Sequence, residues 1–123
     1  MSKKVMVVDD EPDTTLLVDA ILKMNKIGVS TYNDAELALN ELKKNEKYDL
    51  ILLDIRMPKI SGPEFCELVR KNPKTKNIKI VFFTASSNVD KTKMEKMGVL
   101  GVINKPFNND ELVKVVLKYI TMK

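Results

Sequence analysis

Five polar side chains follow apolar runs, at the places where buried strands would end: Asp9, Asp10, Asp54, Thr84 and Lys105. A short unbroken apolar run, such as residues 50–53, is typical of a strand that is buried on both faces of a parallel sheet. Open α/β sheets carry their chemistry at the carboxyl ends of their strands. We therefore expect these side chains to meet at one edge of a single sheet.

Carboxylates gathered in this way repel one another, since two unit charges about 4 Å apart cost about 4 kcal/mol at an effective dielectric constant of about 20. Such a cluster either keeps protons or binds a cation. The chain has no histidine and one cysteine, so the expected cation is not zinc but a hard, oxygen-bound ion such as Mg²⁺. Lys105 offers a point charge and Thr84 a hydroxyl donor. The set predicts a phosphoryl group on or beside a carboxylate, with its oxygens neutralised by the metal ion and Lys105.

Each of these residues has an ordinary structural explanation when it is taken alone. Aspartate is common in turns and at helix N-termini, and threonine after a strand is unremarkable. The functional interpretation rests on their joint occurrence at four strand ends.

Apolar runs predict strands at residues 5–8, 29–32, 50–53, 78–83 and 100–103. Segments with apolar residues at helical spacing follow these strands. Strict alternation with right-handed crossovers predicts the α/β class, with a doubly wound five-stranded parallel sheet, (βα)5. The more polar strand at 29–32 is expected at the edge of the sheet.

Capping residues predict where the helices begin. Three helices are expected to start with an N-cap residue followed three positions on by glutamate: Asn33 and Glu36, Ser61 and Glu64, Asn108 and Glu111. Pro12 suits the first turn of the helix after the first strand. A weak, short helix is predicted over residues 87–97, closed by Gly98.

Composition predicts a single globular domain over residues 1–123, with 44% hydrophobic and 31% charged residues. No apolar run approaches the roughly 20 residues that a membrane span needs. The lone Cys66 excludes an internal disulfide and indicates a reducing compartment, so we expect the cytoplasm. Residues 84–123 hold seven lysines and four acids, yet the chain has only two arginines, so direct nucleic-acid binding is not expected.

These motifs resemble the receiver domain of two-component response regulators, over essentially the whole chain. The matching pieces are residues 7–11 (VVDDE), 53–58 (LDIRMP), 61–62 (SG), 84–85 (TA) and 105–107 (KPF). The resemblance implies a flavodoxin-like receiver fold and a single-domain protein similar to chemotaxis regulators.

The resemblance also implies roles for the residues at the strand ends. Asp54 would be the phosphoacceptor, attacking the phosphohistidine of a partner histidine kinase. Mg²⁺ would be held by Asp10, Asp54 and the backbone carbonyl of Arg56, with Asp9 joining through water. The side chain of Arg56, together with Ser86, would flank the approach of attacking water.

A switch is implied as well. Lys105 would pair with the phosphoryl oxygens, and the Thr84 hydroxyl would move to bond to the same oxygens. The peptide bond between Lys105 and Pro106 would be cis. Many receivers carry tyrosine or phenylalanine on the fifth strand where this chain has Val102. In the usual coupling of the family, the aromatic ring turns inward while the hydroxyl residue moves toward the phosphate, so the part played by the ring is absent or altered here. A structural role, as a β-branched strand residue that faces the core, explains Val102 equally well.

Several functions remain open within this family. A stand-alone regulator, either a chemotaxis-type messenger or a phosphorelay intermediate, competes with the excised N-terminal domain of a longer transcriptional regulator. We expect a phosphoacceptor switch rather than an enzyme with an external product, acting as a monomer or weak dimer. Its downstream protein target is expected on the face of the last two helices and the fifth strand, where the lysines predict an acidic partner.

Two readings from other classes fit less well. An aspartate-nucleophile phosphatase would need a second aspartate two residues after Asp54, where Arg56 stands. A flavodoxin-like FMN carrier would need a hydroxyl- and glycine-rich phosphate loop after the first strand, where the acids at 9–11 would repel phosphate.

Overall fold

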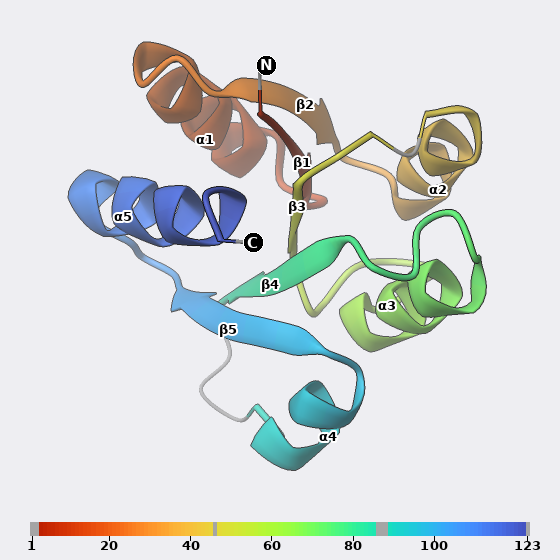
Figure 1. Cartoon of the computed structure of the whole chain (residues 1–123). Coiled ribbons are helices and arrows are strands. Elements are labelled where there is room, and N and C mark those ends of the chain that lie inside the picture. The colour runs from red at the N-terminus through yellow and green to blue at the C-terminus, as the bar shows by residue number, and fades with distance from the viewer. Residues whose placement is uncertain (1–2, 46, 86–88, 123) are drawn as a thin grey trace.

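The computed structural model describes residues 3–45, 47–85 and 89–122. Strands and helices alternate along this part of the chain (Figure 1). The strands are β1 (Lys4–Val8), β2 (Gly28–Tyr32), β3 (Leu50–Leu53), β4 (Lys79–Thr84) and β5 (Val99–Asn104). The helices are α1 (Pro12–Met24), α2 (Ala35–Lys44), α3 (Gly62–Lys71), α4 (Lys91–Lys96) and α5 (Asn109–Ile120). All neighbouring strands are parallel, in the order β2-β1-β3-β4-β5, which confirms the predicted doubly wound sheet.

The sheet separates two hydrophobic cores. Figure 1 shows α1 and α5 on one side of the sheet and α2, α3 and α4 on the other. Along β3, Leu50 and Leu52 pack into the core beneath α1 and α5, whereas Ile51 and Leu53 pack into the other core. Each such side chain contributes roughly 1.5–3 kcal/mol when it is fully buried. This double burial explains why the inner strand reads as one continuous apolar run.

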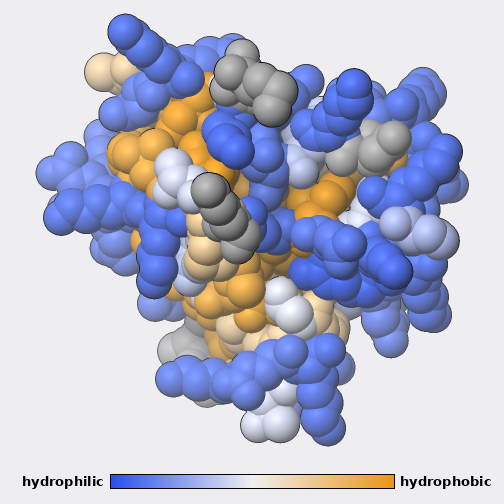
Figure 2. Space-filling model, viewed as in Figure 1, coloured by the Kyte–Doolittle hydropathy of each residue, from blue (hydrophilic) through white to orange (hydrophobic). Residues whose placement is uncertain are grey.

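The two edge strands are less buried than the inner ones. β2 has no fully buried residue, which fits its more polar sequence and confirms its place at the edge. Figure 2 shows hydrophilic side chains over much of one face of the molecule, with hydrophobic ones visible between them. None of the helices in the described ranges is long and apolar enough to cross a membrane.

The predicted helix starts were correct at two of three places. Ser61 forms a full capping box with Glu64, and Asn108 caps α5. The expectation that Asn33 caps α2 was wrong, because the side chain of Asp34 accepts the backbone amides of the first turn instead. A carboxylate at this position also interacts favourably with the helix dipole, which an amide does not. The helix expected over 87–97 is shorter than predicted, and residues 86–88 lie outside the described ranges.

Arg70, at the end of α3, ties three segments together. Its guanidinium donates hydrogen bonds to the backbone carbonyls of four residues: Lys76, Ile78, Met97 and Gly98. The first two belong to the connection into β4, and the last two form the turn between α4 and β5. Arginine suits this place because its planar fork presents several donors in fixed directions.

We expect replacement of Arg70 by lysine or methionine to lower the free energy of unfolding by roughly 2–3 kcal/mol, because carbonyls lose charged donors. Lysine keeps the charge but cannot reproduce the fork, so both variants should be similarly destabilised. Urea unfolding followed by circular dichroism measures the change. Lys71→Met, on the exposed neighbour, is the control. A variant Arg70→Lys as stable as the wild type would contradict the role of the fork.

Candidate functional site

The sheet register places the predicted site residues at one edge. Val8 is paired with Leu53 across β1 and β3, so Asp9 and Asp54 follow directly after partners on neighbouring strands. The amide of Asp54 donates to the Val8 carbonyl at 2.9 Å, which extends the pairing up to the carboxylate. Both aspartates are almost fully buried, with 1% and 5% of their surface exposed. Their approach is therefore a consequence of strand pairing and not of loop geometry.

The same register brings Thr84 and Lys105 to this edge. Thr84 is the last residue of β4 and pairs with Asn104 of β5, immediately before Lys105. The Lys105 amide donates to the Thr84 carbonyl at 2.9 Å. Thr84 is buried, and the bond between Lys105 and Pro106 is cis, as predicted.

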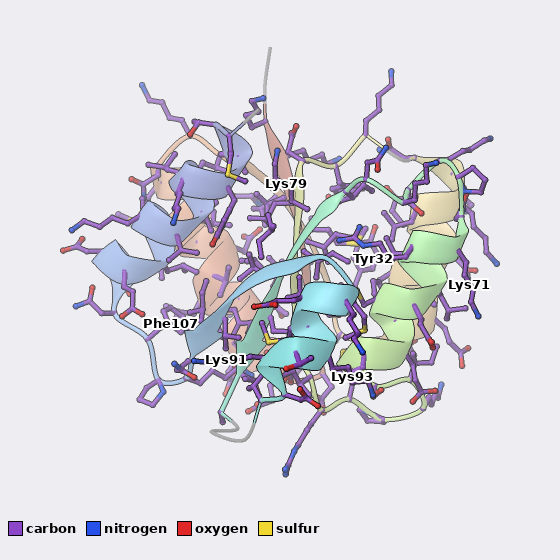
Figure 3. The ribbon with its side chains drawn as sticks, turned by 60° about the horizontal axis from the view of Figure 1, so that its bottom comes forward. Tyr32, Lys71, Lys79, Lys91, Lys93 and Phe107 are labelled. Atoms are coloured by element: carbon purple, nitrogen blue, oxygen red, sulfur yellow. The ribbon has the colours of Figure 1, made fainter. Side chains whose placement is uncertain are left out.

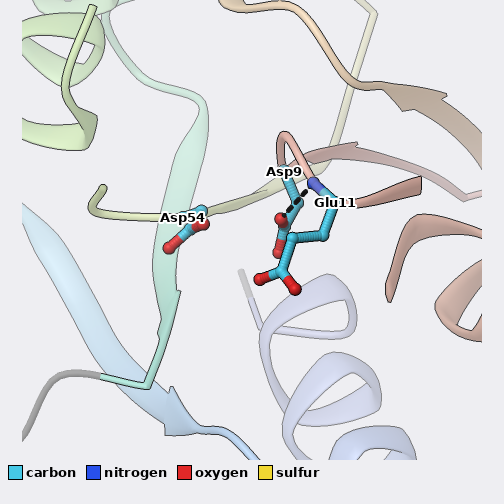
Figure 4. A group of neighbouring side chains, drawn as sticks. All are labelled: Asp9, Glu11 and Asp54. Atoms are coloured by element: carbon cyan, nitrogen blue, oxygen red, sulfur yellow. Dashed lines mark hydrogen bonds between the residues drawn. The ribbon is translucent and has the colours of Figure 1, made fainter. Parts of the chain in front are cut away.

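Three carboxylates form what we call the acidic cluster: Asp9, Glu11 and Asp54. They offer one oxygen each, and these atoms lie within 4.8 Å of one another (Figure 4). The amide of Glu11 donates to Asp9 Oδ1 at 2.9 Å, which holds the Asp9 carboxylate toward the loop. No role for Glu11 was predicted from the sequence, although it stands in the acidic run after β1.

Asp10 lies beside the acidic cluster and is not one of its three members. Its side chain is half-buried, and its negative charge is one of the smaller causes that raise the pKa of Asp54. Its expected role as a metal ligand stays a prediction.

Lys105 lies among the three carboxylates. Its Nζ is 2.5 Å from Asp9 Oδ2, 3.4 Å from Glu11 Oε1 and 3.6 Å from Asp54 Oδ2. Burial alone would lower the pKa of Lys105, but the hydrogen bond and charge of Asp9, with the other two carboxylates, raise it. The ammonium therefore stays charged and partly neutralises the cluster.

One ammonium does not balance three carboxylates. Burial, followed by the negative charge of Asp9, raises the pKa of Asp54 to about 6, although the charge of Lys105 opposes the shift. A site that holds excess negative charge among oxygen donors fits a hard divalent cation such as Mg²⁺. Donor chemistry and charge thus agree with the predicted metal.

Two backbone features fix the loop that follows Asp54. The amide of Arg56 lies 3.4 Å from Asp54 Oδ1, so the backbone of Arg56 is next to the carboxylate, whereas its side chain is exposed. Gly62 packs so closely that a Cβ there would lie 2.6 Å from the Asp54 carbonyl oxygen. Only glycine fits this approach, which accounts physically for the glycine of the Ser-Gly pair of the motif. Ser86 lies outside the described residues.

Comparisons with known proteins identify one family. A family model described as "Response regulator receiver domain" matches residues 5–117. The chain is 34% identical over 111 residues to the transcriptional regulatory protein CpxR homolog of Haemophilus influenzae, spanning 89% of this chain and 47% of that protein. It is 32% identical over 125 residues to sporulation initiation phosphotransferase F of Bacillus subtilis, spanning 100% of this chain and 98% of that protein. The chain thus spans about half the length of the first relative and nearly all of the second.

Solved structures agree with this fold. Chemotaxis protein CheY4 of Vibrio cholerae superposes with a TM-score of 0.90 at 29% identity, covering 97% of this chain and 99% of that one. The receiver domain of sensor histidine kinase PA1611 from Pseudomonas aeruginosa, with a magnesium ion in its active site cleft, has a TM-score of 0.87. It covers 99% of this chain and 100% of that one, and at 23% identity it supports the fold alone.

We expect Asp54→Asn to stabilise the metal-free protein above pH 6, by about 1–3 kcal/mol, because the variant removes a charge that folding desolvates. The pKa of Asp54 rises from its ordinary 3.8 to about 6 on folding. Its contribution to stability is therefore present in full below about pH 4 and is lost as the pH rises to about 6.

Urea unfolding in EDTA at pH 4 and pH 7 measures this difference. Asp13→Asn, at an exposed position on α1, is the control and should not be stabilised at pH 7, because its carboxylate is not buried. An Asp54→Asn variant that is less stable than the wild type at pH 7 would show that the buried charge is fully compensated.

Proposed function

The chain belongs to the response regulator receiver family, and from the arrangement of its site we propose that Asp54 accepts a phosphoryl group from the phosphohistidine of a histidine kinase, in a Mg²⁺-dependent reaction. The observation that carries the proposal is the meeting of Asp9, Glu11 and Asp54 around the ammonium of Lys105. Receivers are phosphoacceptor switches, and the only chemistry proposed for this one is its own phosphorylation and dephosphorylation.

In the proposed step, an oxygen of the Asp54 carboxylate attacks phosphorus. The new O–P bond forms as the P–N bond of the phosphohistidine breaks, and the imidazole nitrogen keeps the electron pair. Lys105 is 3.6 Å from Asp54 before the reaction, so its charge is available to the transferred phosphoryl oxygens. We assign the buried Thr84 as the hydroxyl that then bonds to them.

The proposed Mg²⁺ ligands are Asp10, Asp54 and the Arg56 carbonyl, with Asp9 through water. Bound Mg²⁺ would supply positive charge opposite the phosphoryl oxygens. Glu11 joins these candidates because it is the third member of the acidic cluster. The acidic donors of the described site support this assignment.

We propose that phosphorylation changes the surface of α4, β5 and α5. Val102 is half-buried and lines a groove of about 490 Å³ between β5 and α4, together with Met94 and Leu100. A valine cannot turn inward as an aromatic ring does, so we expect Thr84 to act on α4 without a rotating partner. We therefore expect the structural change on phosphorylation to reach this face more weakly than in receivers that carry an aromatic residue at this position.

The relatives favour a single-domain regulator as the first candidate. Two proteins that match over nearly their whole length are a phosphotransferase of sporulation and a chemotaxis protein, which correspond to the phosphorelay and chemotaxis alternatives. The receiver domain of a longer transcriptional regulator is the second candidate, because the match covers 47% of the CpxR homolog. Aspartate-nucleophile phosphatase activity is not supported by these comparisons. We place the protein in the cytoplasm, as a monomer or weak dimer.

Incubation with acetyl phosphate and Mg²⁺ tests the phosphoacceptor. We expect intact-mass spectrometry to show the addition of one phosphoryl group to the wild type and none to Asp54→Asn or in EDTA. Asp13→Asn should gain phosphate like the wild type, because its side chain is exposed on α1. Equal uptake by Asp54→Asn and the wild type would refute the assignment.

Charge reversal tests the partner face. Lys91 and Lys93 are exposed on α4 (Figure 3), and Lys118 is exposed on α5. Changing all three to glutamate should weaken binding of a phosphorylation-dependent partner by roughly tenfold or more, since like charges would then face each other. Surface plasmon resonance at two salt concentrations measures the change.

The matched control for this face reverses three exposed lysines on other helices: Lys43, Lys44 and Lys71. This set makes the same change in net charge and should leave the affinity near that of the wild type. An equal loss with both sets would show that net charge, and not this face, determines binding.

A further inference from the structure

We propose that Asn33 is a positioning residue for the acidic cluster, an inference that rests on the proposed function. Its Nδ2 donates one hydrogen bond to the Asp9 carbonyl and one to Thr15 Oγ1, both at 2.9 Å. These partners flank the loop that carries Asp10 and Glu11. Asn33 therefore connects the end of β1 to the start of α1 across the acidic loop.

The contacts require an amide donor at this position. The Asp9 carbonyl can only accept a hydrogen bond, and the Thr15 hydroxyl directs its own proton to the Pro12 carbonyl at 3.1 Å. Thr15 Oγ1 must then accept from Asn33. Both hydrogens of the Asn33 amide are used, and a carboxylate of the same shape would offer none.

The backbone amide and the backbone carbonyl of Asp9 both form hydrogen bonds to residues at the end of β2 or directly after it. Its amide donates to the Tyr32 carbonyl at 3.0 Å, and its carbonyl accepts from Asn33. The Asp9 carbonyl shares a peptide plane with the Asp10 amide, so a rotation of this plane moves the start of the acidic loop. The Asp9 carboxylate meanwhile contacts Glu11 and Lys105. The geometry offered to a cation thus depends on the contact that Asn33 makes.

Capping and positioning are separated in this chain. Asp34 accepts the first-turn amides of α2, so a change at Asn33 leaves the cap intact. Asn33 is also exposed, so a smaller side chain there leaves no buried cavity. Substitution of Asn33 should consequently affect the site more than the stability of the fold.

The test is a titration of the metal-free chain (residues 1–123) with MgCl₂, followed by two-dimensional ¹H–¹⁵N NMR. Asn33→Ala removes the donors, and Asn33→Asp keeps the shape but replaces the donors by charge. We expect both to raise the Kd for Mg²⁺ by about threefold to tenfold, the effect of one or two neutral hydrogen bonds. If only the added negative charge of Asn33→Asp mattered, Mg²⁺ would bind more tightly. Loss of the hydrogen-bond donors predicts a higher Kd and the added charge predicts a lower one, so this variant distinguishes the two effects.

Asn40→Asp, at an exposed position of α2, makes the same change in charge and should bind Mg²⁺ like the wild type. Equal or tighter binding by either Asn33 variant overturns the inference, as does a loss of unfolding free energy in urea with no change in Kd. A wild type that binds no Mg²⁺ instead overturns the proposed function. The two failures are thereby distinguished.

Discussion

The confinement of three carboxylates around one ammonium is the constraint on which the site depends. Parallel strands force Asp9 and Asp54 together, because they follow paired residues and have no room to separate. Lys105 relieves part of the repulsion, yet burial, followed by the negative charge of Asp9, still raises the pKa of Asp54. The two cores on either side of the sheet stabilise the fold against this local cost. The charged edge is thus held in place by the apolar strands that deliver it.

Whether a site residue could be predicted from the sequence depends on what determines its place in the fold. The meeting of Asp9, Asp54 and Lys105 could be inferred from sequence, since the carboxyl ends of parallel strands all lie at one edge of the sheet. Glu11 could not, because its place depends on the path of the loop after β1. Strand-end chemistry is determined by topology, whereas loop chemistry is determined by individual hydrogen bonds.

The error at the start of α2 has the same origin. Asn33 and Asp34 are both good N-cap residues, and no local pattern distinguishes them. The distinction comes from two tertiary acceptors, the Asp9 carbonyl and the Thr15 hydroxyl. An amide nitrogen has two hydrogens to donate to them, whereas a carboxylate has none. Long-range partners far from Asn33 in sequence therefore decided which residue caps the helix. The bounds of α4 were also uncertain from sequence, because six residues carry little helical period.

The carboxyl end of α4 is tied to α3, and this bears on how the proposed phosphorylation of Asp54 would act on this helix. Arg70 binds the carbonyls of Met97 and Gly98, so the carboxyl end of the helix is tied to α3. The other end follows the segment that leaves Thr84, where the phosphoryl group would act. With Val102 in place of an aromatic ring, little bulk on β5 can move with that segment. Remodelling after the proposed phosphorylation should therefore be small at the carboxyl end of α4, because displacement is resisted where Arg70 binds the backbone carbonyls.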